Sequence, residues 1–182
     1  MRADYNTLHK RMKYQIDMYK YNNRKEITLE AAAQLLQNIL YGNRFFPIYA
    51  FCILGGVDST GTPTLFNYDA IGSYQKVRGT AVGSGSDLAL SILDSLILRH
   101  HRMPQGHSNT TTTTTSSTST EAHPVGAGPV GAGELSVDQG IEYAHQIFAS
   151  VSERDIYTGD AVEIYVVSKD GVQKILRPLK MD

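Results

Sequence analysis

The sequence contains no tryptophan and only one cysteine among its 182 residues. A single cysteine excludes an internal disulfide framework and suits a reducing compartment. Cys52 lies within a short apolar run, and free cysteine packs as a small hydrophobic side chain. We therefore interpret Cys52 as a buried core thiol.

Long apolar runs and an excess of charge of one sign are also missing. The longest apolar run, residues 48–54, is far too short to cross a bilayer. The 17 basic and 18 acidic side chains nearly cancel, which gives no electrostatic argument for a nucleic-acid or membrane partner. The N-terminus reads Met1-Arg2-Ala3-Asp4 and continues polar, so we expect no signal peptide.

Large apolar side chains are scarce in the segment at about 101–134. It contains six consecutive threonines, a Ser/Thr run and two copies of Pro-Val-Gly-Ala-Gly. This composition buries too little apolar surface to offset the entropy of ordering the chain. We predict a disordered Thr/Ser/Gly-rich insertion within a single domain that spans residues 1–182.

Histidine does not point to a metal centre. Four of the six histidines flank or enter the insertion: His100, His101, His107 and His123. They have no cysteine partner and no fixed spacing, whereas zinc sites require both a defined ligand set and a defined geometry. We predict no metal site and no cofactor.

Helical periodicity predicts two helices before residue 41, with a break at Asn22-Asn23. Thr28 is expected to cap the second helix, and Gly42 to end it. One apolar stripe is expected on that helix: Leu29, Ala33, Leu36 and Leu40. A third helix is predicted after residues 83–86, and a fourth over residues 137–151, where Ser136 and Gln139 have capping-box spacing.

Strands are predicted between these helices. Residues 48–54 read as a strand covered on both faces, and residues 64–68 as its partner in a hairpin. Residues 74–81 contain a further short strand, and residues 161–167 and 172–179 form a second hairpin. Paired helices that alternate with paired strands indicate an α+β fold with helices on the outer faces of the sheets.

Five short motifs occur in a characteristic order. They are Arg44-Phe45-Phe46-Pro47, Gly55-Gly56-Val57-Asp58, Asp69-Ala70-Ile71-Gly72-Ser73-Tyr74-Gln75, Gly83-Ser84-Gly85-Ser86 and Glu153-Arg154-Asp155-Ile156-Tyr157-Thr158-Gly159-Asp160. In this order they resemble 20S proteasome beta subunits, and the match is best to one of the non-catalytic subunit types. The resemblance covers residues 1–99 and 136–182.

The resemblance implies a four-layer αββα sandwich of the N-terminal-nucleophile hydrolase type. It implies assembly with other proteasome alpha and beta subunits, with two stacked beta rings between alpha rings. The particle acts in ATP- and ubiquitin-dependent protein degradation in the cytoplasm and nucleus. We therefore expect a structural subunit that is not itself an enzyme but belongs to a threonine endopeptidase complex.

In active members of this family an N-terminal threonine attacks the peptide carbonyl, and its own amine relays the proton. By motif match, Ser84, Asp155 and Thr158 correspond to residues that support this nucleophile. The family's nucleophile and lysine lie on a strand pair before the first helix, whereas here a helix is predicted from about Asp4. We expect that strand pair to be missing. The alternative is a catalytic threonine-type subunit whose N-terminal segment lies outside this sequence.

The same residues also have structural interpretations. Ser84 stands where a hydroxyl would cap a helix N-terminus, and Arg154 and Asp155 would form a local ion pair at a helix end. We therefore expect Ser84, Asp155 and Thr158 to be remnants of the family's active-site scaffold.

Asp69 is the candidate binding residue. The resemblance implies that it lines the pocket of the adjacent beta-5 subunit for the third residue upstream of the cleaved bond in a peptide substrate. The alternative is that its side chain closes an Asx-type turn at the end of a strand. The sequence leaves both interpretations open.

Overall fold

The computed structural model describes residues 2–58, 60–98 and 135–180. The elements are α1 (Arg2–Asn23), α2 (Leu29–Tyr41), β1 (Ile53–Val57), β2 (Pro63–Tyr68), β3 (Tyr74–Val77), α3 (Ser86–Leu93), the π-helical turn η1 (Asp94–Leu98), α4 (Val137–Ser152), β4 (Ala161–Ser168) and β5 (Gly171–Pro178). This order confirms the predicted α+β class. The insertion predicted at about 101–134 lies outside the described residues.

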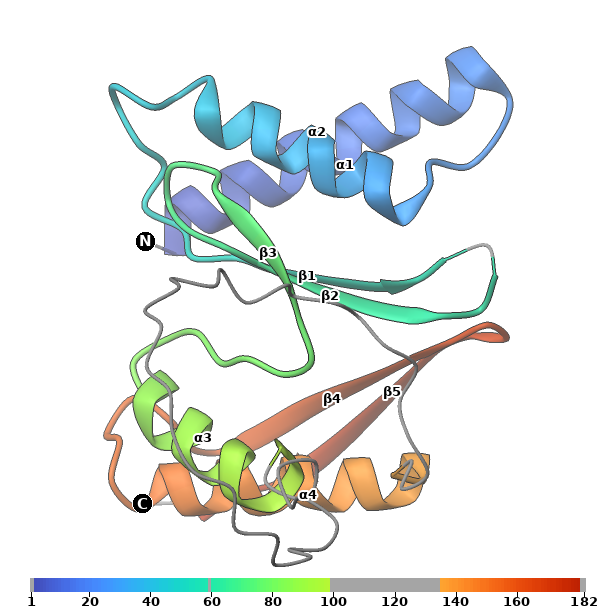
Figure 1. Cartoon of the computed structure of the whole chain (residues 1–182). Helices are drawn as coiled ribbons and strands as arrows, with labels where there is room; N and C mark the ends of the chain where they lie inside the picture. Colours follow the sequence, from blue (N-terminus) through green and yellow to red (C-terminus); the bar gives the residue numbers. More distant parts are fainter. Residues whose placement is uncertain (1, 59, 99–134, 181–182) are drawn as a thin grey trace, which may run out of the picture.

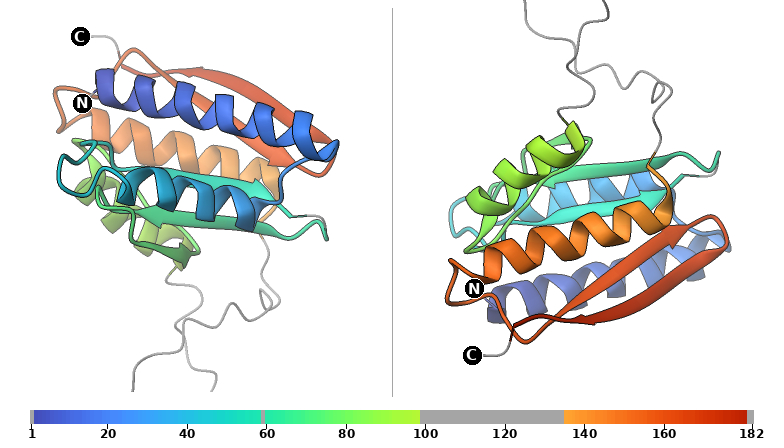
Figure 2. Two further views of the ribbon diagram at one scale, coloured as in Figure 1. Left: turned by 90° about the horizontal axis from the view of Figure 1, so that it is seen from above. Right: turned by 90° about the horizontal axis from the view of Figure 1, so that it is seen from below.

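The strands form two separate antiparallel sheets, one in the order β1-β2-β3 and one containing β4 and β5. Helices α1 and α2 lie on one side of the three-stranded sheet, and the β4–β5 hairpin lies on its other side (Figure 1). Helices α3 and α4 lie beyond that hairpin, and the views from above and below show α4 running alongside it (Figure 2).

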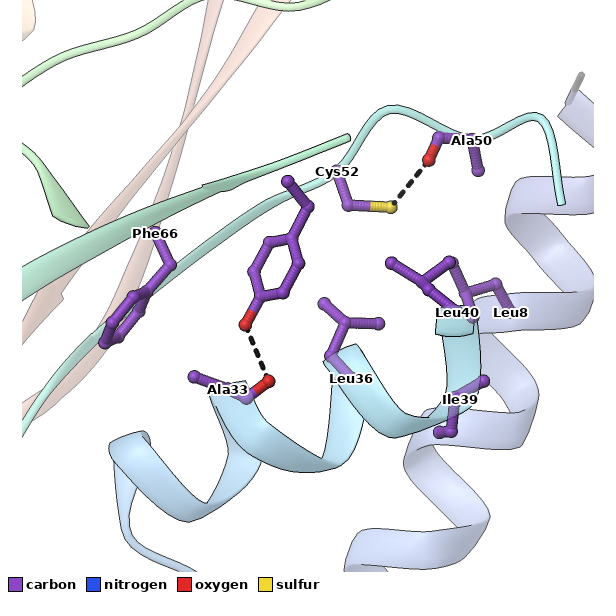
Figure 3. Close-up of a cluster of buried hydrophobic side chains, with 9 residues drawn as sticks. Leu8, Ala33, Leu36, Ile39, Leu40, Ala50, Cys52 and Phe66 are labelled. Atoms are coloured by element: carbon purple, nitrogen blue, oxygen red, sulfur yellow. Dashed lines mark hydrogen bonds between the residues drawn. The ribbon is translucent and has the colours of Figure 1, made fainter. Parts of the chain in front are cut away.

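The main core lies between α1, α2 and the three-stranded sheet (Figure 3). The Thr28 side chain accepts a hydrogen bond from the Ala31 N–H at 3.3 Å, which confirms the predicted cap. The predicted stripe of α2 packs against the three-stranded sheet: Leu29 lies against Gly56 of β1, and the Tyr68 hydroxyl of β2 donates to the Ala33 carbonyl at 2.8 Å. Burial raises the pKa of Tyr68, so the phenol stays protonated and keeps this bond. The core comprises Leu8, Ala33, Leu36, Ile39, Leu40, Ala50, Cys52, Phe66 and Tyr68.

The first strand differs from its prediction in extent and coverage. It begins at Ile53, not at residue 48, because its partner β2 ends at Tyr68 and the chain turns away at Asp69. The predicted run is covered on one face and not on both, since Cys52 is buried whereas Phe51 is 58% exposed. The buried thiol is as predicted, and burial raises the pKa of Cys52.

Helix α4 packs on the second hairpin. Ser136 and Gln139 exchange both capping-box hydrogen bonds, as predicted. On this helix Ile147 and Val151 are buried, whereas Val137 is 59% exposed.

No helix in the described part of the chain is both long and apolar enough to span a bilayer.

Candidate functional site

The structure brings together three residues that the sequence analysis singled out. The Ser84 hydroxyl donates to Asp155 Oδ2 at 2.7 Å, and the Thr158 hydroxyl donates to the same oxygen at 2.8 Å. The backbone N–H of Tyr157 donates to Asp155 Oδ1 at 3.2 Å. A single carboxylate therefore joins the entry of α3 to the loop between α4 and β4.

These hydrogen bonds favour the ionised carboxylate. They lower the pKa of Asp155, with the Ser84 hydroxyl as the largest contributor, followed by the Thr158 hydroxyl and the Tyr157 N–H. Two hydroxyl donors on one oxygen also fix the rotamers of both side chains.

Two structural interpretations from the sequence are wrong. The N-cap of α3 is Gly85, which has no side-chain cap, and Ser84 bonds to Asp155 instead. Arg154 and Asp155 form no ion pair, although both lie in the described part of the chain. The carboxylate is held by neutral donors, because the turn after α4 directs it toward the start of α3.

Gly85 makes this approach possible. A Cβ built at this position would lie 2.5 Å from Val151 Cγ1 and 3.0 Å from Asp155 Oδ2. Any larger residue would push α3 away from α4 and separate the carboxylate from Ser84. The Gly-Ser-Gly-Ser motif therefore needs a glycine at position 85, because a side chain there would collide with Val151 and Asp155.

A cavity of about 370 Å³ opens beside this cluster. Its lining is mainly apolar and includes Ile53, Val82, Leu93 and Phe148, with Ser84 and Thr158 at its polar side. The residues described around it include no lysine and no histidine.

Asp69 holds a tight loop between β2 and β3. Its Oδ1 accepts hydrogen bonds from three backbone N–H groups, those of Ile71 at 3.0 Å and of Gly72 and Ser73 at 2.7 Å each. The Asx-type turn is therefore confirmed. The turn also sets the exposed Asp69 on the wall of a second cavity.

This second cavity has a volume of about 410 Å³. It is lined by Phe51, Asn67, Tyr68, Asp69, Ser73, Tyr74, Gln75 and Val82. Sequence reasoning missed Asn67, whose buried Oδ1 has no hydrogen-bond partner among the described residues. Asn67 stands between Phe66 and Tyr68, which both face the core. Because alternate residues of a strand face opposite sides of the sheet, this position was the sequence signal that Asn67 faces the other side.

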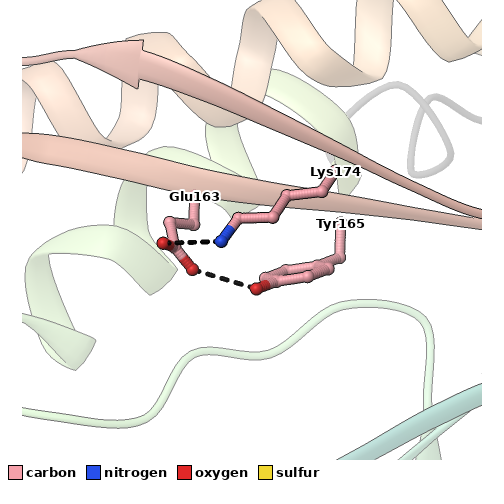
Figure 4. A network of polar contacts seen from close by, with 3 residues as sticks. All are labelled: Glu163, Tyr165 and Lys174. Atoms are coloured by element: carbon pink, nitrogen blue, oxygen red, sulfur yellow. Dashed lines mark hydrogen bonds and ion pairs between the residues drawn. The ribbon is translucent and has the colours of Figure 1, made fainter.

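Titratable side chains also meet on the second hairpin (Figure 4). Lys174 Nζ lies 2.9 Å from Glu163 Oε1, and the Tyr165 hydroxyl donates to Glu163 Oε2 at 3.0 Å. Lys174 is the main cause of the lowered pKa of Glu163, followed by Tyr165. The ion pair is about half exposed, so it is screened by solvent and we interpret it as cross-strand support.

Across the described ranges, no group of three or more His, Cys, Asp or Glu side chains could hold a metal ion. The histidines at 100, 101, 107 and 123 lie outside these ranges.

Comparison with known proteins gives these sites a context. Residues 1–107 match the family model for proteasome subunits. The chain is 37% identical to proteasome subunit beta type-1 of Arabidopsis thaliana over 182 residues, which cover 99% of this chain and 71% of that protein. The chain belongs to the proteasome beta-subunit family. It is also 34% identical to beta type-1 of Oryza sativa subsp. japonica over 99% of the chain and 72% of that protein. The chain is 31% identical to proteasome subunit beta type-6 of Saccharomyces cerevisiae, over 99% of this chain and 68% of that protein.

The sequence motifs match best the beta-6 type, which is also called beta type-1, and the names of these relatives agree with that match. That Ser84, Asp155 and Thr158 are remnants of the family's active-site scaffold stays a prediction. The described structure shows the cluster as a set of hydrogen bonds that join the entry of α3 to the loop between α4 and β4.

Proposed function

We propose that the chain is a non-catalytic, structural beta subunit of the 20S proteasome core, where it helps to build the inner ring. The observation that carries this proposal is the 37% identity to a beta type-1 subunit across 99% of the chain. Its partners would be the other alpha and beta subunits, in two stacked beta rings between alpha rings. The particle would act in ATP- and ubiquitin-dependent degradation in the cytoplasm and nucleus.

The proposal includes the fold. A four-layer αββα sandwich of the N-terminal-nucleophile hydrolase type is supported by helices outside both sheets and by the β4–β5 hairpin next to the three-stranded sheet (Figure 1). We treat residues 1–182 as one beta-type domain, with residues 101–134 as an insertion.

Within that fold, Ser84, Asp155 and Thr158 would act as a structural joint. The carboxylate accepts two hydroxyl donors and one backbone N–H from two places in the chain, the entry of α3 and the loop after α4. The cavity beside it has no lysine in its described lining. A catalytic threonine-type subunit is the less favoured alternative, because the relatives above are of the beta type-1 and type-6 kinds.

An active-site probe tests this part of the proposal. Particles purified with the tagged chain would be treated with a peptide vinyl sulfone, which labels threonine nucleophiles covalently. We expect label on other beta subunits and none on this chain. Label on this chain, mapped by mass spectrometry to an N-terminal threonine, would support the catalytic alternative.

Asp69 is the residue that we propose to take part in substrate binding. Its carboxylate would contribute to the substrate pocket of the adjacent beta-5 subunit, at the third residue upstream of the cleaved bond. The Asx-turn holds one carboxylate oxygen with three N–H groups, so the side chain is fixed on the wall of the second cavity. A fixed acceptor loses little entropy when it binds a peptide donor.

The test of this role is Asp69→Asn, which can keep the turn but removes the charge. For peptides that differ at the third upstream residue, we expect the ratios of kcat/KM to shift by about tenfold, the value of a charged hydrogen bond. Asp58→Asn is the matched control, because Asp58 holds the β1–β2 turn in the same way. If the kcat/KM ratios are the same in Asp69→Asn as in Asp58→Asn, Asp69 does not contribute to the pocket.

A further inference from the structure

Asn67 is a partly buried polar residue to which the proposed function gives no role. It lies in β2, the central strand of the three-stranded sheet, directly opposite Ile53 of β1 and Gln75 of β3 (Figure 1). Its neighbours Phe66 and Tyr68 are buried in the core, so the Asn67 side chain lies on the other face of the sheet. There it lines the cavity of about 410 Å³ that also contains Asp69.

The carboxamide oxygen of Asn67 is an unused acceptor. This Oδ1 atom is removed from solvent, and no hydrogen-bond donor among the described residues reaches it. A buried acceptor without a donor destabilises the chain that contains it, and most buried polar atoms of folded proteins have a partner. Because Asn67 borders the cavity, an occupant can bring a donor to this atom after a side-chain rotation.

Asp69 supplies a second acceptor in the same cavity. Its Oδ1 already accepts three backbone N–H groups, those of residues 71, 72 and 73. Its Oδ2 accepts no hydrogen bond from the described residues, and the Asp69 side chain is exposed. One carboxylate oxygen therefore holds the loop, and the other is available to an occupant.

The remainder of the cavity wall favours a positively charged occupant. Among the eight residues described along this wall, Asp69 is the only charged one. Phe51 and Tyr74 add aromatic surface, which attracts cations through the faces of the rings. A negative charge, an unpartnered carboxamide oxygen and aromatic surface together fit an alkyl side chain that ends in an ammonium group with three N–H donors.

We propose that Asn67 determines specificity for the peptide substrate, together with Asp69. The two side chains accept hydrogen bonds from the ammonium group of a lysine at the third residue upstream of the cleaved bond, Asn67 through Oδ1 and Asp69 through Oδ2. This inference rests on the proposed function, which assigns Asp69 to that pocket. It adds a second residue to the pocket and names the class of peptide that the pocket selects.

Arginine fits this pair of acceptors less well than lysine. Its planar guanidinium pairs best with both oxygens of one carboxylate. At Asp69 one of these oxygens is already occupied by the backbone of its own loop. An ammonium group has no such planar requirement, because its three donors rotate about the end of a flexible stem.

Peptide kinetics in the assembled particle test the proposal. Two fluorogenic substrates of the adjacent beta-5 subunit would differ only at the third upstream residue. This residue is lysine in one peptide and norleucine, which has the alkyl stem without the ammonium group, in the other. In Asn67→Leu we expect the lysine-to-norleucine ratio of kcat/KM to fall about tenfold, the value of a hydrogen bond to a charged group. Asn67→Asp retains an oxygen acceptor and is expected to retain or raise this ratio.

Thr64→Val is the matched control. It removes a hydroxyl group from the same strand, and Thr64 does not line the cavity. We expect this variant to leave the lysine-to-norleucine ratio unchanged. An unchanged ratio in Asn67→Leu, or an equal fall in Thr64→Val, would overturn the proposal. A loss of kcat/KM that is equal for the two peptides would also overturn it, because Asn67 would then contact the peptide backbone.

The Asp69→Asn variant separates this inference from the proposed function. If Asp69→Asn shifts the lysine-to-norleucine ratio and Asn67→Leu does not, the role of Asn67 is refuted and the role of Asp69 stands. If neither variant shifts the ratio, both roles are refuted. If the unmodified chain does not enter particles, the proposed function fails and this inference fails with it.

The stability of the isolated chain provides a second measurement. Since Asn67 Oδ1 has no donor among the described residues, leucine at this position removes an unsatisfied acceptor and no hydrogen bond. We expect the midpoint of urea unfolding for Asn67→Leu to equal or exceed that of the wild type. A lower midpoint would show that Asn67 already has a partner, such as an ordered water molecule, and would overturn the proposal.

Discussion

Replacement of Gly72 by alanine tests how the Asp69 loop is positioned. Gly72 has a φ of +100° and is buried against the end of α2. A Cβ at this position would lie 2.9 Å from the Gln37 carbonyl oxygen, 3.0 Å from Leu40 Cβ and 3.1 Å from the Tyr41 N atom. Two of these atoms belong to the backbone of a helix, so they cannot move aside as a flexible side chain would.

Two costs follow from this geometry. A non-glycine residue in the left-handed region costs about 1–2 kcal/mol. Overpacking against fixed atoms costs about 1–3 kcal/mol more. A gain of about 0.4–1 kcal/mol from the reduced entropy of the unfolded chain offsets part of this. We therefore expect Gly72→Ala to lower the free energy of unfolding by about 1–5 kcal/mol.

Gly171→Ala is the matched control. Gly171 also has a positive φ, +135°, but a Cβ there would meet nothing within 4 Å, so only the backbone cost remains. Urea titrations followed by far-ultraviolet circular dichroism give the two losses of stability. The reasoning is refuted if Gly72→Ala costs no more than Gly171→Ala, because contact with α2 would then contribute nothing.

Two other predictions use the same titration. Phe66→Ala should cost about 3–5 kcal/mol, because Phe66 is only 2% exposed in the core, whereas Phe45→Ala should stay within about 0.5 kcal/mol. Similar losses for both would contradict the assigned core. The pKa of Asp155 is lowered from its ordinary 3.8, so its contribution to stability is fully present above that pH and is lost as the pH falls through the lower, folded-state pKa. We expect the stability of the wild type to fall more steeply below about pH 4 than that of Asp155→Asn. Identical pH profiles would show that the hydroxyl contacts of Asp155 do not persist in solution.

The sequence predicts best where local signals are complete. The capping box at Ser136 and Gln139 needs only four consecutive positions, and the structure contains both of its hydrogen bonds. The Thr28 cap depends in the same way on neighbouring backbone N–H groups. Such features form within one turn of helix, so distant packing does not decide them.

The first strand shows where local signals fail. Residues 48–54 have the composition of a buried strand, yet pairing begins at Ile53 and continues through Gly55 and Gly56. The length of a strand depends on where its partner ends. The Asp69 turn sets that end, and the apolar run carries no information about it.

The candidate site depends on contacts between distant parts of the chain. Ser84 and Asp155 are 71 residues apart, and their residue types alone suggested a helix cap and an ion pair, both of which are wrong. Only the family resemblance grouped them with Thr158. The spatial reason lies at Gly85, where the absence of a side chain lets α3 approach Val151 and the carboxylate.

Phe45 and Phe66 are expected to differ in their effect on the stability of the isolated chain. Phe45 is 97% exposed, so its removal leaves folding of the isolated chain almost unchanged. A partner that binds only the folded chain adds stability according to its concentration relative to Kd. A change at Phe45 should therefore leave the stability of the isolated chain almost unchanged, whereas a change at Phe66 lowers it. A comparison of these two phenylalanines, 21 residues apart in the sequence, distinguishes an exposed ring from a ring of the core.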